Sequence, residues 1–109
     1  MALTKTRTRT QTALTRLAML IANVHGELAL VDRLLVNPAE LTDAKLQGLS
    51  AKRAELRELR TALYASSRQF DPRLDPADIG SDDGWLKKFG RGGGTLAVER
   101  YLKALESLP

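Results

Sequence analysis

Hydrophobic side chains recur at alternating steps of three and four residues between positions 14 and 35. This spacing is typical of a helix that packs along a partner helix through a heptad seam. A second apolar stripe lies beside the first, and together they are wider than one neighbouring helix covers. The seam comprises Leu14, Leu17, Ile21, Val24, Leu28, Val31 and Leu35, and the second stripe comprises Leu20, Leu30 and Leu34. The first predicted helix is therefore expected to contact more than one neighbour.

A turn and a second long helix are predicted after this segment. Asn37-Pro38-Ala39-Glu40 is typical of a helix start, because it combines an Asn cap, a Pro at the first helical position and a Glu at the capping-box position. Thr42 is an alternative cap. The second helix is expected to end near Gln69, since Asp71-Pro72 follows. Its apolar positions recur every seven residues, at Leu49, Leu56, Leu63 and Phe70.

Two glycines interrupt the long helices at matching distances from this turn. Gly26 and Gly48 are equally far from Asn37 in sequence, so in an antiparallel pair each would lie roughly 16 Å from the bend. One interpretation is a close crossing or hinge between the helices. The alternative is that well-packed helices tolerate two glycines, each costing about 1 kcal/mol relative to alanine.

Two shorter helices are predicted near the C-terminus, after a proline-containing connector. One is expected around Trp85, with acidic residues before it and Gly90 as its stop. The other is expected to be capped by Thr95 and to run to about Leu108. The aromatic residues all lie in the second half of the chain, at Tyr64, Phe70, Trp85, Phe89 and Tyr101. They are expected to form one cluster that folds the tail over the open end of the long helical pair.

The pattern as a whole predicts an all-α fold built on a long antiparallel, coiled-coil-like helical hairpin. We expect a basic flexible arm at residues 1–12, the hairpin at 13–70, and at 71–109 a connector with two short helices that pack on it. A chain of 109 residues buries only part of its apolar surface, so oligomerisation is expected to complete a helical bundle. The predicted oligomer interface is Leu14, Leu17, Leu20, Ile21, Val24, Leu28, Val31, Leu34 and Leu35.

Composition narrows the possible chemistry. The chain has no cysteine and one histidine, His25, which leaves almost no material for metal binding or nucleophilic catalysis. No acid–base pair stands out either, so we expect a protein that is not an enzyme and uses no metal or cofactor. The unbroken apolar runs are short, which argues against a membrane-spanning segment and favours a cytoplasmic location.

Charge suggests an anionic partner. The net charge is +4, and Glu27 is the first acidic residue in the chain. An extended N-terminal arm could contact phosphates, although a solvated terminus would have the same composition. Residues 87–94 combine lysines with glycines and could approach an anion through backbone N–H groups, but they lack the Walker spacing and also suit a simple interhelical joint. The candidate nucleic-acid contacts are Lys5, Arg7, Arg9, Arg16, Lys87, Lys88 and Arg91.

Two functional hypotheses follow. The first is a non-enzymatic, oligomerising adaptor or assembly protein, a homodimer or larger, whose basic N-terminal end contacts DNA or RNA. The second is a protein-binding helical module, such as a small chaperone or a structural subunit, with no role in nucleic-acid binding. In that case the partner would bind the region of Trp85 and Tyr101 or the second stripe of the first helix.

Overall fold

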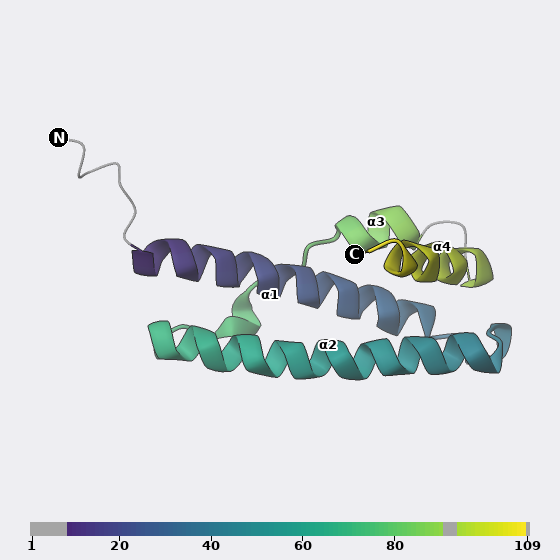
Figure 1. The fold of residues 1–109 in the computed structure, drawn as a ribbon, viewed down its shortest axis with the longest axis horizontal. Helices are drawn as coiled ribbons and strands as arrows, with labels where there is room; N and C mark the ends of the chain where they lie inside the picture. The colour runs from purple at the N-terminus through teal and green to yellow at the C-terminus, as the bar shows by residue number, and fades with distance from the viewer. Residues whose placement is uncertain (1–8, 91–93, 109) are drawn as a thin grey trace.

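The computed structural model describes residues 9–90 and 94–108, and the side chains of residues 12–37, 39–90 and 95–108. This part of the chain consists of helices and contains no strand, which confirms the all-α prediction. The helices are α1 (Arg9–Leu34), α2 (Asp43–Phe70), α3 (Gly84–Phe89) and α4 (Gly94–Glu106), with short 3₁₀ turns at η2 (Pro38–Glu40) and η3 (Pro76–Asp78) (Figure 1).

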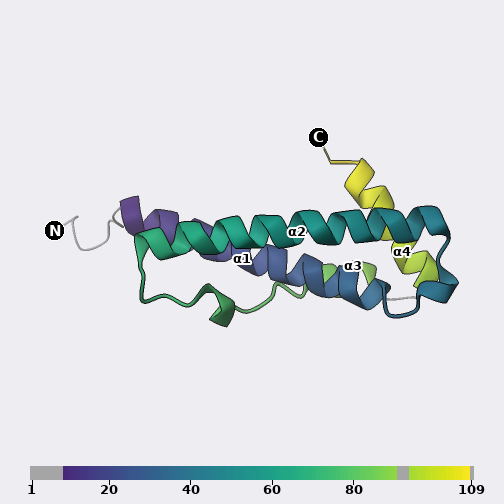
Figure 2. The same cartoon turned by 90° about the horizontal axis from the view of Figure 1, so that it is seen from below.

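The two long helices lie side by side and run in opposite directions (Figures 1 and 2). The hydrophobic core lies along this helix pair. In it, Val24, Leu28 and Val31 from the heptad seam of α1 pack in one cluster with Leu49 and Leu56 of α2. These side chains are nearly or fully buried. Their burial at about 25 cal/mol per Å² of apolar surface is the main force that holds the pair together.

Both predicted helix starts, at Asn37 and at Thr42, occur in the turn between the long helices. The Asn37-Pro38 segment forms only the single turn η2, in which the Glu40 N–H donates to the Asn37 carbonyl at 3.2 Å. The long helix α2 begins afterwards, where the Thr42 hydroxyl accepts a hydrogen bond from the Lys45 N–H at 3.3 Å. Thr42 is therefore the cap of α2.

The short helices α3 and α4 cover the half of α1 that lies nearest the turn (Figure 1). Trp85, Phe89 and Tyr101 meet there, with ring centroids 5.5 to 6.0 Å apart. The prediction of a single aromatic cluster at the open end is wrong, because Tyr64 pairs with His25 instead and Phe70 remains 45% exposed. The reason is that the connector, residues 71–83 between α2 and α3, is anchored at the middle of α1 through Asp82 and Ala22. From there α3 and α4 continue toward the turn between the long helices.

The predicted close crossing of α1 and α2 at Gly26 and Gly48 is wrong, because the nearest neighbours of both glycines lie outside these two helices. The alternative of a hinge at these glycines stays a prediction. A Cβ on Gly26 would lie 2.0 Å from the carbonyl oxygen of Asp82, so the lack of a side chain at Gly26 lets the connector pack directly against α1. A Cβ on Gly48 would lie 4.0 Å from Leu102 of α4 and meets nothing closer. The two glycines face different neighbours and have different roles.

The first long helix also resembles a membrane span in length and composition. Residues Thr12–Leu34 have a mean hydropathy of 1.3 over the most apolar 18-residue window, with 33% of that window buried inside the chain. The sequence expectation considered only unbroken apolar runs and missed this average. The core helices of soluble proteins meet the same criterion, and Leu30 and Val31 of this helix are completely buried.

Candidate functional site

A histidine at the middle of α1 holds the connector in place. His25 Nδ1 lies 2.9 Å from the Ile79 carbonyl oxygen, and Nε2 lies 2.5 Å from the Tyr64 hydroxyl. Because a carbonyl only accepts, Nδ1 carries a proton and donates to Ile79, and in the neutral ring Nε2 then accepts from the Tyr64 hydroxyl. The single histidine therefore links α1, α2 and the connector.

The next anchor lies one turn away on the same helix. The Asp82 N–H donates to the Ala22 carbonyl at 2.9 Å, which leaves the Asp82 backbone directly against Gly26. The Asp82 side chain then accepts from the Gly84 N–H at 3.0 Å and starts α3. The direction of α3 thus follows from a backbone contact that only a residue without a Cβ permits at position 26.

A buried tyrosine joins α4 to the long helices. The Tyr101 hydroxyl donates to Glu27 Oε1 at 2.5 Å, and Lys52 Nζ lies 3.8 Å from the same oxygen. Tyr101 is completely buried. Burial and the neighbouring Glu27 carboxylate raise the pKa of the Tyr101 phenol well above its usual range, since both disfavour the phenolate.

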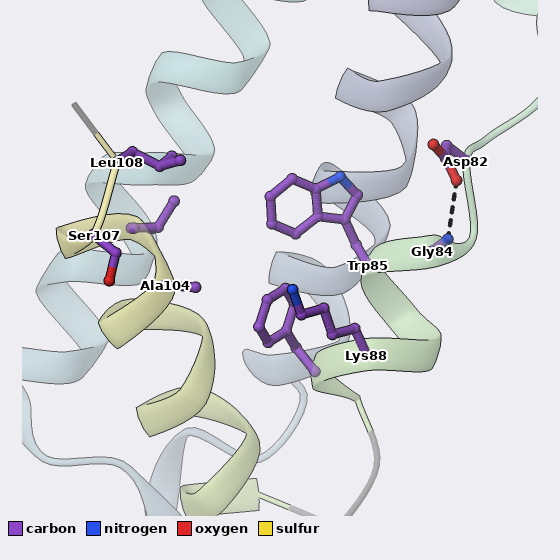
Figure 3. A pocket seen from close by; sticks show the side chains of 9 residues that line it. Asp82, Gly84, Trp85, Lys88, Ala104, Ser107 and Leu108 are labelled. Carbon is purple, nitrogen blue, oxygen red and sulfur yellow. Dashed lines mark hydrogen bonds between the residues drawn. The ribbon is translucent and has the colours of Figure 1, made fainter.

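A cavity of about 580 Å³ opens between α3 and α4 (Figure 3). Trp85 and Lys88 extend from α3 toward Ala104 of α4 and toward Ser107 and Leu108, which follow the end of α4. Its lining is completed by Asp82, Gly84, Phe89 and Leu105. Most of the wall is apolar, and the volume lies in the range of cavities that hold small molecules.

A second hollow, with a basic lining, adjoins this cavity. Both share Lys88, Phe89, Ala104 and Ser107, and the second adds Arg100 and Lys103 of α4. Lys88 Nζ also lies 5.2 Å from the centre of the Phe89 ring, as in a cation–π contact. Glu99 of α4 does not line this hollow and pairs with Lys45 of α2.

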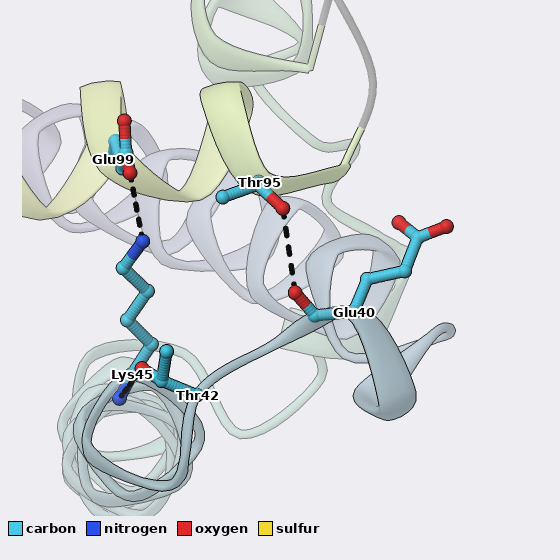
Figure 4. Close-up of polar contacts among 5 residues, drawn as sticks. All are labelled: Glu40, Thr42, Lys45, Thr95 and Glu99. Atoms are coloured by element: carbon cyan, nitrogen blue, oxygen red, sulfur yellow. Dashed lines mark hydrogen bonds and ion pairs between the residues drawn. The ribbon is translucent and has the colours of Figure 1, made fainter.

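Polar contacts fix the start of α4 against the turn (Figure 4). Lys45 Nζ lies 2.8 Å from Glu99 Oε1, and hydrogen bonding to this ammonium lowers the pKa of the Glu99 carboxyl. Thr95 was expected to cap α4, but the helix begins at Gly94 and the Thr95 hydroxyl donates to the Glu40 carbonyl at 3.3 Å. The threonine thus ties two segments together instead of closing its own helix.

The other half of the long helical pair has no cover from α3 and α4 (Figure 1). Leu20 lies two turns before Glu27 on α1, and Leu59 lies two turns after Lys52 on α2. Since Glu27 and Lys52 mark the face that α4 covers, the two leucines extend the same face past its end. Leu20 is 50% exposed, Leu59 47% and the nearby Met19 63%.

The structure places most of the predicted oligomer interface inside the single chain. Ile21, Val24, Leu28, Val31 and Leu34 are buried in it, which leaves them almost no surface for a second copy. Leu14, Leu17 and Leu35 are half-buried, and Leu20 is the one exposed member. Of the second stripe, Leu30 and Leu34 are buried in the cluster that includes Phe89 of α3 and Tyr101 of α4, and Leu20 is exposed.

The predicted nucleic-acid contacts are not brought together where they are described. Lys5, Arg7, Arg91 and the side chain of Arg9 lie outside the described residues. Arg16 is exposed on α1, and Lys87 and Lys88 are exposed on α3. The end of α3 at Gly90 borders Arg33, and Arg16 is roughly 25 Å from Arg33 along the helix.

Sequence reasoning missed the connector anchors and the basic hollow. Arg100 and Lys103 are three residues apart on α4, a spacing that indicates a shared helix face. Nothing in the sequence places Lys88 beside them, because that neighbourhood depends on how α3 and α4 dock. In the part of the chain with described side chains, no group of three or more His, Cys, Asp or Glu residues could hold a metal ion.

The described residues thus define an all-α chain with two long helices and two short ones. Comparison with protein-family profiles, curated proteins and solved structures found no match.

Proposed function

We propose that this protein is a non-enzymatic helical assembly module that forms a homo-oligomer, most simply a dimer, through the uncovered end of α1 and α2. The observation that carries the proposal is the exposure of Leu20 and Leu59 on one face, just beyond the end of α4. Two such ends packed face to face would complete a four-helix core.

The chemistry of this end suits a second copy of the chain. Around Leu20 and Leu59 the exposed residues include Arg16 on α1 and Glu55 on α2, so the surface has both charge signs near an apolar centre. A two-fold axis can pair each charge with its opposite on the other copy. Apolar residues at the centre with charges at the rim are the usual arrangement of such interfaces.

The test is molecular mass by light scattering at several concentrations. We expect the wild-type chain to form a dimer or larger species, and Leu20→Glu and Leu59→Glu each to shift it to the monomer by placing a charge in the apolar centre. Leu96→Glu is the matched control, since Leu96 is 46% exposed on α4, away from this end. A monomeric wild-type chain, or an equal effect of the control, would contradict the proposal.

A second function, contact with nucleic acid, rests on the basic end that adjoins this surface. Arg16 is exposed on α1 four residues before Leu20, and no acidic residue precedes Glu27. A dimer formed at Leu20 would therefore hold two basic ends close together, and paired weak phosphate contacts bind more strongly than either alone.

This second function predicts a strong dependence on salt. Binding of single-stranded or duplex DNA or RNA should weaken by about tenfold or more between 50 and 200 mM salt if several phosphates are contacted. Removing residues 1–8, which include Lys5 and Arg7, should weaken it strongly without changing the number of chains in the oligomer. A salt-independent affinity, or no binding at low salt, would exclude this function while leaving the assembly proposal standing.

A further inference from the structure

We propose that the cavity between α3 and α4 binds a small amphiphilic anion, a molecule with one apolar chain or ring and one negatively charged group such as a carboxylate. This inference is independent of the proposed assembly function, because the cavity and the uncovered end lie on different parts of the molecule.

The apolar part of the ligand would lie between α3 and α4. Trp85 is half-buried, and Leu108 is 62% exposed at the other wall (Figure 3). Leu105 and Phe89 add apolar lining. A chain placed there would cover the indole face and the Leu108 side chain, both of which water now contacts, and the gain is proportional to the apolar area removed from water.

The charged part would lie in the adjoining hollow. Lys88, Arg100 and Lys103 line it together with Phe89, Ala104 and Ser107, and no acidic residue is among these six. None of the three cations forms an ion pair with a carboxylate of the described residues. Three unpaired cations beside an apolar wall favour an anion over a neutral or cationic ligand.

The one acidic residue of the cavity lies away from this charge. Asp82 borders the end nearest Gly84, where its side chain accepts the hydrogen bond of the Gly84 N–H. The Ser107 hydroxyl donates to the Lys103 carbonyl at 3.1 Å, so it is already engaged. The cavity is therefore polarised, with its positive side at Lys88 and α4, and the ligand would lie with its head group there.

The experiment uses Trp85 as the reporter, because it is the only tryptophan of the chain. The full-length protein is titrated with octanoate, 1-octanol and octylammonium, which share one chain and differ in head-group charge. We expect octanoate to shift the Trp85 emission to shorter wavelength and to bind about tenfold more tightly than octylammonium, with octanol between them. Equal affinity for the three ligands, or no response to any, would overturn the proposal.

Matched variants locate the charge. Lys88→Gln with Lys103→Gln should weaken octanoate binding by about tenfold, at a few-fold for each exposed cation. Lys87→Gln is the control, since Lys87 is the neighbouring exposed lysine of α3 and does not line either hollow. If the double variant binds octanoate as the control does, the assignment of the head group is wrong.

A third variant and a second ligand source complete the test. Ala104→Phe should fill the space shared by the two hollows and abolish binding while circular dichroism stays unchanged, and the surface variants above decide the question if this one does not fold. Vesicles of an anionic phospholipid form the other arm. A Trp85 response to vesicles without one to octanoate would overturn the small-ligand proposal in favour of a membrane surface.

Discussion

Gly26→Ala is expected to destabilise the chain by about 2 kcal/mol, within the range for overpacking a close contact. The added Cβ would lie 2.0 Å from the Asp82 carbonyl oxygen and 2.9 Å from its carbonyl carbon, and both belong to backbone that cannot rotate away. Either the connector lifts from α1 or the helix bends. Lifting would also stretch the hydrogen bond from the Asp82 N–H to Ala22.

Gly48→Ala is the matched control and is expected to have the opposite sign. Gly48 lies in the interior of α2, is exposed, and has no atom closer than 4.0 Å to its added Cβ. Alanine there should stabilise the chain by about 0.5–1 kcal/mol through helix propensity and a less flexible unfolded chain.

The comparison of these two glycine variants uses urea unfolding, followed by circular dichroism for the helices and by Trp85 fluorescence for the docking of α3. Gly26→Ala should lower both transitions, the Trp85 transition more. Stabilisation by Gly26→Ala of the same size as by Gly48→Ala would show that the connector does not rest on this glycine.

Tyr101→Phe is expected to cost about 1.5–3 kcal/mol at neutral pH, the range for a hydrogen bond to a charged group. The variant keeps the ring but removes the hydroxyl that donates to Glu27, whose side chain is only 13% exposed. The carboxylate is then left with Lys52 at 3.8 Å as its remaining partner. Equilibrium unfolding at pH 7 measures the change.

The same tyrosine predicts a loss of stability in alkali. The ordinary pKa of a tyrosine is near 10, and in the folded chain the pKa of Tyr101 is raised. Above about pH 10 the unfolded chain therefore releases this proton while the folded chain retains it, so the free energy of unfolding falls as pH rises. Below pH 10 both states are protonated and this contribution does not change.

The control for this pH effect is the difference between wild type and Tyr101→Phe across pH 7 to 11. The advantage of the wild type should be constant up to about pH 10 and should shrink above it, because the variant has no phenol at this position. Parallel curves over the whole range would contradict a buried, hydrogen-bonded Tyr101. Lysines also titrate there, but they contribute equally to both proteins.

Sequence reasoning located the helices well and their neighbours less well. The heptad spacing and the prolines placed the long helices near their observed bounds, because helix periodicity and helix breakers act within a few residues. The burial partners of α1 were assigned to a second copy of the chain, whereas Leu30 and Leu34 are buried by the chain's own residues. A stripe of leucines predicts that this face of the helix is buried. It does not predict which apolar surface buries it, because any apolar surface can do so.

The candidate sites show the same limit. Lys88 was singled out from the sequence, but Arg100 and Lys103 were not, because the three side chains line one hollow only when α3 and α4 dock. His25 had no apparent role, since its partner Ile79 lies in an irregular segment whose path no periodic pattern predicts.

The sequence by itself determined that this chain is helical, where its long helices lie, and that α1 needs cover on two sides. Tertiary structure alone decided what supplies the cover and how far it reaches. Hydrophobic burial is non-directional, so the spacing of apolar residues is enough to predict which faces of α1 must be buried. Directional contacts, from the Asp82 backbone on Gly26 to the Tyr101–Glu27 hydrogen bond, choose one arrangement and leave Leu20 and Leu59 exposed.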